Sequence, residues 1–254
     1  MFAETTCGVY GKLPVHGDFV HRNLPASSIE SWDEWLQSFV AGTREQLADD
    51  WLDMYLSAPV WRFALSSGVL NENAYLGVLI PSVDRVGRYF PLTLLEPVDS
   101  EIGLLELIEL RANWFTNVEE LLLESLDGQL DIDNLMFELS KIPNETTTTY
   151  RKLDSYCDGQ NAVVNMEFEE QSPASVFPQL LESLLVSSFS SFSLWTTSGS
   201  DFVEPCTMLS QGLPKIGQVS AMLDGYWSSR GWNFPYQLLT EEIINQSERE
   251  TNDE

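Results

Sequence analysis

Two histidines and an aspartate lie close together near the start of this 254-residue chain: His16, Asp18 and His21. Imidazole and carboxylate groups are ligands that zinc accepts, but a zinc site needs three or four of them. The chain has only these two histidines and contains neither an HExxH sequence nor paired CxxC sequences. We therefore expect a solvent-facing or capping cluster without a metal. The alternative is a hydrolase or metalloenzyme site built on the same three residues.

Other catalytic signatures are incomplete. The pair Gly11-Lys12 resembles the end of a phosphate-binding P-loop, but Thr6 stands where the motif needs its first glycine and Leu13 where it needs Ser or Thr. The GxSxG sequence of serine hydrolases does not occur. A Ser-His-Asp triad stays open, because its members meet in space rather than in sequence. We expect a protein with no catalytic residues and no cofactor.

A second group of charged residues lies on the segment Pro81–Pro91, which joins two predicted strands. Asp84, Arg85 and Arg88 fall within five residues of one another, and Gly87 permits a tight bend between them. Arginine readily forms forked ion pairs with carboxylates. The first expectation is therefore an internal role, in which these arginines hold loops together.

The pairing partners considered for Arg85 and Arg88 are Asp84, Asp18 and Asp33. The second expectation is a functional one, because guanidinium groups also bind carboxylates and phosphates of other molecules. On this interpretation an acidic or phosphorylated group of a partner protein binds at Arg62, Asp84, Arg85 and Arg88.

The composition limits the partners and the compartment. With 13 basic and 39 acidic residues the formal charge is −26, which repels phosphate backbones and anionic lipid heads. We expect no nucleic acid and no membrane partner, and a basic patch on another protein fits better. The N-terminus has no basic and apolar signal-peptide pattern, and three widely spaced cysteines suit a reducing compartment. These features predict a cytoplasmic protein.

The elements that position these residues follow from hydrophobic periodicity and from turn residues. In the first half they are extended pieces at Cys7–Tyr10 and Asp18–His21, helices from Pro25 to about Val40, at Asp49–Leu56, Ile102–Leu126 and Ile132–Leu139, and strands at Val60–Leu65, Tyr75–Ile80 and Arg88–Leu95. Short connections between the three strands predict an antiparallel meander. Trp32, Trp35, Trp51 and Trp61 are expected in the core.

In the second half we expect strands at Ala162–Phe168, Phe192–Thr196 and Thr207–Ser210, and helices at Pro173–Ser187 and Ile216–Leu223. The predicted fold is α/β of the α+β type, a mainly antiparallel mixed sheet covered by helices, in two closely packed halves. The predicted division is residues 1–140, residues 141–244 and a disordered acidic tail at residues 245–254.

Several segments, in order, resemble one family. They are Gly11–Val20, Leu24-Pro25, Trp32–Leu36, Ala58–Phe63, Gly77–Leu92, Ser193–Ser200 and Gly212–Pro214. Together they are similar to the TagF (ImpM) family associated with type VI secretion. The long block Gly77–Leu92 is the most specific, whereas residues 101–170 carry no recognised motif, and Val15 and His21 depart from the family pattern.

The resemblance implies a non-catalytic accessory protein of the cytoplasm that represses type VI secretion after translation. It also implies that the partner is the forkhead-associated scaffold protein of the secretion system. Some family members are fused to a phosphatase domain, for which this chain has no room.

Overall fold

A computed structural model describes residues 7–99, 101–144, 147–153, 162–166 and 172–236 of the chain. Its centre is one seven-stranded sheet in the order β2-β1-β5-β4-β3-β6-β7, in which all neighbouring strands are antiparallel. The strands are β1 (Gly8–Gly11), β2 (Val20–Arg22), β3 (Trp61–Leu65), β4 (Ala74–Ile80), β5 (Leu92–Val98), β6 (Phe192–Thr197) and β7 (Cys206–Gln211). The predicted α/β fold with an antiparallel sheet, including its β3-β4-β5 meander, is confirmed.

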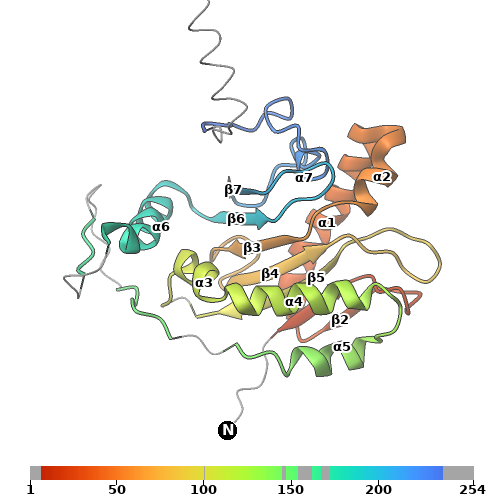
Figure 1. The fold of residues 1–254 in the computed structure, drawn as a ribbon, viewed down its shortest axis with the longest axis horizontal. Helices are drawn as coiled ribbons and strands as arrows, with labels where there is room; N and C mark the ends of the chain where they lie inside the picture. Colours follow the sequence, from red (N-terminus) through yellow and green to blue (C-terminus); the bar gives the residue numbers. More distant parts are fainter. Residues whose placement is uncertain (1–6, 100, 145–146, 154–161, 167–171, 237–254) are drawn as a thin grey trace, which may run out of the picture.

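Helices cover both faces of this sheet (Figure 1). One face carries α3 (Leu104–Leu110), α4 (Ala112–Ser125) and α5 (Ile132–Leu139), and the other carries α1 (Ala26–Leu47), α2 (Trp51–Leu56) and α7 (Ala221–Asp224). Helix α6 (Phe177–Ser188) lies beside α3, and the 3-10 helices η1 (Ala48–Asp50) and η2 (Pro173–Val176) lead into α2 and α6. Because both faces are covered, all seven residues of β4 are buried.

The core under α1 is rich in aromatic rings. Trp32 lies 5.1 Å from Trp35, and Phe63 lies 4.8 Å from Trp195, measured between ring centroids. All four tryptophans predicted to be core residues are buried. Gly77 on β4 leaves room for the Phe63 ring, because a Cβ atom there would lie 2.3 Å from its Cζ. The aromatic layer thus fixes the distance between α1 and the sheet.

The sheet runs through both predicted halves of the chain. Strand β6, which lies beyond the predicted boundary near residue 140, pairs with β3 from Arg62↔Thr196 to Leu65↔Ser193. Strand β7 extends the same sheet. The halves therefore share one sheet rather than each having its own. The division at residue 140 itself stays a prediction, and the predicted acidic tail at residues 245–254 lies outside the described residues.

Several predicted elements of the first half have different bounds in the structure; for example, the helix predicted from Pro25 to about Val40 runs on to Leu47. The third strand of the meander begins at Leu92 instead of Arg88, because Pro91 lacks an amide hydrogen and Arg88 is held in the preceding loop. The single helix predicted over Ile102–Leu126 is divided into α3 and α4 at Arg111. The Arg111 guanidinium there pairs with the buried Glu96 carboxylate at 2.6 Å.

Two predictions in the second half need correction as well. The strand predicted at Ala162–Phe168 is wrong over residues 162–166, which are irregular. Val163 is 87% exposed, so its apolar side chain does not pack against the core. Residues 167–168 lie outside the described part. The helix predicted at Ile216–Leu223 is confined to Ala221–Asp224, preceded by turns.

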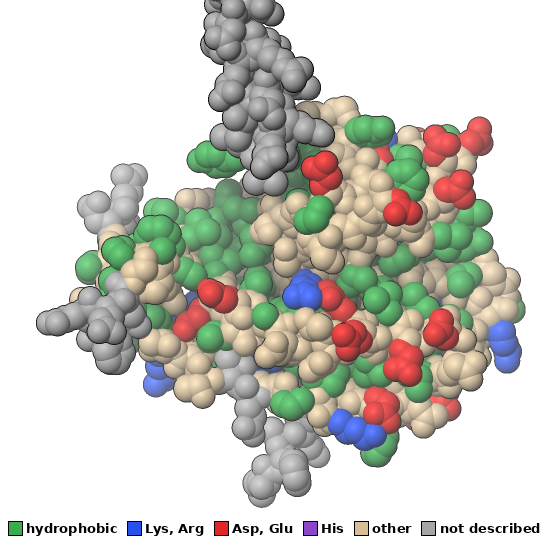
Figure 2. All heavy atoms as spheres, in the orientation of Figure 1, with side chains coloured by type: hydrophobic (Ala, Val, Ile, Leu, Met, Phe, Trp, Pro, Cys, Tyr) green, Lys and Arg blue, Asp and Glu red, His purple; other side chains and the backbone are tan. Residues whose placement is uncertain are grey.

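The surface carries the acidic excess. On the face shown in Figure 2, Asp and Glu side chains are spread over α4 and α5, and Lys and Arg side chains stand at only a few places. Among the described residues there is no helix with the length and apolar composition that crossing a membrane requires.

Candidate partner-binding site

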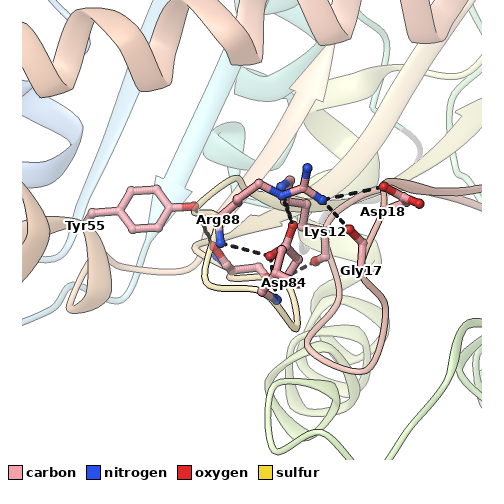
Figure 3. A network of polar contacts seen from close by, with 8 residues as sticks. Lys12, Gly17, Asp18, Tyr55, Asp84 and Arg88 are labelled. Carbon is pink, nitrogen blue, oxygen red and sulfur yellow. Dashed lines mark hydrogen bonds and ion pairs between the residues drawn. The ribbon is translucent and has the colours of Figure 1, made fainter.

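Asp84 lies at the centre of the loop between β4 and β5, with its side chain fully buried. Oδ1 accepts hydrogen bonds from the backbone amides of Val86 (3.0 Å) and Arg88 (2.9 Å). Oδ2 accepts from Lys12 Nζ (2.5 Å) and Arg88 Nε (2.7 Å) (Figure 3). A carboxylate has about four lone-pair sites, and all four are used here.

These contacts determine the charge of the group. Burial alone favours the neutral acid, but hydrogen bonds from Lys12, from Arg88 and from the two amides outweigh it and hold the pKa of Asp84 below its usual range. The hydrogen bond with Asp84 correspondingly raises the pKa of Arg88. Asp84 is thus a permanent anion at neutral pH that holds the loop rather than a residue that accepts protons.

Two further elements anchor the loop from behind. Ser82 Oγ donates to the carbonyl oxygen of Lys12 at 2.8 Å, which ties the loop to the end of β1. From α2, Tyr55 Oη donates to the carbonyl oxygen of Ser82 (3.1 Å) and accepts from its amide (3.2 Å) (Figure 3). The base of the loop is therefore rigid, held by both β1 and α2.

The tip of the loop faces solvent. Gly87 has φ +85°, which closes the turn, and the Val86 side chain is 65% exposed. Arg88 is half exposed and donates to the carbonyl oxygen of Gly17, with Asp18 3.6 Å away. Arg85 is exposed, and its guanidinium has neither an ion pair nor a hydrogen bond within the described part of the chain. The arrangement presents a free guanidinium from a fixed base and can bind an anion.

Arg62 does not belong to this loop. Its Nε and Nη2 form a fork with the two carboxylate oxygens of Glu119 at 2.6 and 2.7 Å, and its guanidinium lies 5.6 Å from the Phe115 ring centroid. The fork raises the pKa of Arg62 and connects β3 to α4. Of the four residues proposed from the sequence, the structure therefore groups Asp84, Arg85 and Arg88 and places Arg62 elsewhere. The internal pairing predicted for Arg88 is confirmed.

The residues His16, Asp18 and His21 have separate surroundings. His16 Nε2 accepts from the amide of Ile132 at 3.2 Å and so caps the start of α5. Asp18 is almost fully exposed beside Arg88, and His21 is exposed on β2. Across the described residues, no group of three or more His, Cys, Asp or Glu side chains is arranged to hold a metal ion. The structure thus agrees with the capping interpretation for His16 and not with a three-ligand site.

Sequence reasoning missed the main partner of Asp84. Lys12 was considered only as part of a rejected P-loop, yet its ammonium group is buried against a residue 72 positions away. Tyr55 lies in the helix predicted at Asp49–Leu56, where spacing alone gives no sign of its hydrogen bonds with Ser82. A lysine at the end of a buried strand is a signal of an internal ion pair, because such a charge requires a partner.

The model of the TagF N-terminal domain, described as type VI secretion system-associated, matches residues 8–142. A crystal structure of PA0076 from Pseudomonas aeruginosa is similar over 92% of this chain and 99% of its own, with 32% sequence identity and a TM-score of 0.73. Curated protein sequences gave no significant match. The family match includes the anchored loop and covers more than half of the chain, so the protein belongs to the TagF family of type VI secretion system-associated proteins.

Proposed function

We propose that this protein is a non-catalytic regulator that represses type VI secretion after translation, in the cytoplasm, by binding the forkhead-associated scaffold protein of the system. The observation that carries the proposal is the family match over residues 8–142, which places the chain among proteins of this secretion system. Beyond this match, we propose that the partner is the scaffold protein and that binding it represses secretion.

The loop at Asp84 supports a role in binding. Arginine is enriched where proteins recognise one another, and a guanidinium on a rigid base loses less entropy on binding than one on a mobile loop. We propose that Arg85 contacts the partner and that Arg88 borders the contact. Asp84 positions both, whereas Arg62 stabilises the β3-α4 contact.

The proposal is tested by deleting the gene in a bacterium whose secretion system is active. We expect more effector protein in the medium with unchanged transcript levels of the secretion genes. Supplying the wild-type gene should restore repression, and supplying Arg85→Glu should not, because the reversed charge repels the partner's anion. Affinity capture of the scaffold by the tagged protein measures binding directly.

Lys215→Glu serves as the matched control. Lys215 is exposed and, within the described part of the chain, has no ion pair, so the variant makes the same charge change at a different place. It should restore repression like the wild type, at the same protein level. Unchanged secretion after deletion would contradict the proposed function.

A further inference from the structure

Unpaired cations are rare on this acidic protein. Among the described residues, every Lys and Arg forms an ion pair with a carboxylate except Arg44, Arg85 and Lys215. The chain has three times as many acidic as basic residues, so an exposed arginine without a carboxylate remains available to an anion from outside. Arg44 is exposed on α1, and its guanidinium lies 4.2 Å from the Trp51 ring centroid.

An open hollow lies beside Arg44. We call it the α1 hollow; its lining residues are Phe19, Gln37, Val40, Ala41, Arg44, Glu45 and Phe90. Phe19 is 47% exposed, although its ring already packs edge-on against Phe90 at 4.8 Å and lies 5.1 Å from Lys12 Nζ. The hollow thus offers an aromatic wall that the protein itself leaves half uncovered.

Arg85 is not a lining residue of the hollow, but it comes close to Gly17, two positions before the lining residue Phe19. A Cβ atom on Gly17 would stand 3.5 Å from Arg85 Nη2, so the guanidinium rests over the turn that leads directly into Asp18 and Phe19. The surface therefore has the Arg44 guanidinium, which lies over the Trp51 ring but has no carboxylate partner among the described residues, an aromatic hollow, and the Arg85 guanidinium near the turn before Phe19. Glu45 lines the hollow, Asp33 accepts a hydrogen bond from the lining residue Gln37 at 2.6 Å, and Asp18 faces Arg88.

We infer that the α1 hollow and Arg85 form one docking surface for an acidic segment of a partner protein. A bulky apolar side chain of that segment enters the hollow, one carboxylate pairs with Arg44, and another pairs with Arg85. The local charge pattern supports this occupant against the net charge of −26, because the guanidiniums of Arg44 and Arg85 attract carboxylates at short range, the hollow has apolar walls, and salt screens the repulsion from more distant acids. The inference rests on the proposed function for the identity of the partner and adds the chemistry of the bound segment.

A second copy of the chain is a weaker occupant. Each copy carries a charge of −26, so association of two copies works against strong repulsion. The test can detect this alternative, because dimerisation would make the apparent molecular mass depend on protein concentration.

The test measures binding of a fluorescein-labelled peptide, Gly-Ser-Glu-Asp-Phe-Glu-Asp-Ser-Gly, by fluorescence anisotropy at about 0.15 M ionic strength, where repulsion by distant acids of the protein is largely screened. Two control peptides replace the phenylalanine by alanine or the four acids by their amides. We expect both control peptides to bind more weakly than the parent peptide. Arg44→Glu and Arg85→Glu should each weaken binding of the parent peptide about fivefold or more, because reversal removes an attraction and adds a repulsion.

Two further variants separate binding from folding. Ala41→Trp fills the hollow from an exposed helix position, so it should abolish the advantage of the phenylalanine peptide and leave the thermal melt unchanged. Lys215→Glu is the control for charge. The residues flanking Lys215 contact Trp35, Gly42 and Gln46, on the side of α1 away from Val40 and Arg44, so this variant should bind like the wild type.

Equal peptide affinity in Arg44→Glu and Lys215→Glu would overturn the inference, as would equal affinity for the phenylalanine and alanine peptides. So would concentration-dependent dimers that Ala41→Trp dissolves. Scaffold capture is measured in parallel. If the wild type and Ala41→Trp capture the scaffold equally, the docking surface is wrong and the proposed function stands. If the peptide binds as expected but the wild type captures no scaffold, the proposed function fails and the docking surface serves another acidic protein.

Discussion

The ion pair between Lys12 and Asp84 is the residue-scale feature on which the candidate site depends. Both side chains are nearly inaccessible to solvent. Removing two charges from water is costly, and the cost is met only when the geometry is good and the remaining hydrogen-bonding positions are filled. Asp84 meets both conditions with four donors. A variant without its charge leaves the Lys12 ammonium group buried with no counter-charge.

Asp84→Asn should lower the free energy of unfolding by about 3–5 kcal/mol, because it leaves the Lys12 ammonium group buried without a counter-charge. Urea denaturation at pH 7 measures the loss. Asp18→Asn is the matched control, since it removes a carboxylate that also contacts Arg88 but is almost fully exposed. Asp18→Asn should unfold at the wild-type urea concentration; if the two variants unfold together, the burial of Asp84 is not what stabilises the loop.

The same comparison has a pH dependence. Because folding lowers the pKa of Asp84, its stabilising effect is complete above the unfolded-state pKa of about 3.9 and is lost as the pH falls toward the lower folded-state value. The difference in the free energy of unfolding between wild type and Asp84→Asn should therefore be constant from pH 8 to pH 5 and shrink below about pH 4. A difference that grows on acidification would contradict the assigned charge.

At the scale of elements, close contact between β3, β4 and β5 sets the packing of the aromatic core. Gly77 on β4 faces Phe63 on β3, and a Cβ atom there would also stand 2.4 Å from the backbone oxygen of Leu94 on β5. A side-chain atom could turn away, but a backbone oxygen in a paired strand cannot move without breaking the sheet.

Gly77→Ala should consequently lower the free energy of unfolding by about 2–3 kcal/mol through overpacking. Gly217→Ala is the matched control, because a Cβ atom at Gly217 meets nothing within 4 Å. Thermal unfolding followed by circular dichroism distinguishes the two. Equal melting temperatures would show that the strands separate more easily than the close contacts indicate.

At the scale of the whole molecule, a charge of −26 acts against the compact state. Most basic residues are already paired, and the acidic excess stands on the surface (Figure 2). Self-repulsion of this kind is screened by salt over about 10 Å at 0.1 M ionic strength. Salt should therefore stabilise this protein, whereas it destabilises a protein held together by surface ion pairs.

Raising sodium chloride from 10 to 300 mM should raise the melting temperature by about 2–4 °C, which corresponds to about 1 kcal/mol for a chain of this size. Most of the rise should occur below 200 mM, where screening changes fastest. Sucrose at equal osmolality controls for general solvent effects and should not reproduce this early rise. A melting temperature that falls with salt would indicate that paired charges dominate over repulsion.

Local patterns in the sequence were sufficient for much of the fold. Apolar periodicity located β3, β4 and α5 closely, because each forms from neighbouring residues with one dominant spacing. The cluster of Asp84, Arg85 and Arg88 and the motifs shared with the TagF family could also be read directly. Each of these features is a short continuous stretch of the sequence.

Only the tertiary structure decided which charged groups meet. Lys12 reaches Asp84 across 72 positions and Arg62 reaches Glu119 across 57, while Arg111 pairs with Glu96 where a continuous helix was predicted. Many carboxylates were available to each cation in a chain with 39 acids, so sequence spacing could not choose among them. Sheet order and helix packing made that choice, and among the described residues they left Arg44 and Arg85 without a carboxylate partner.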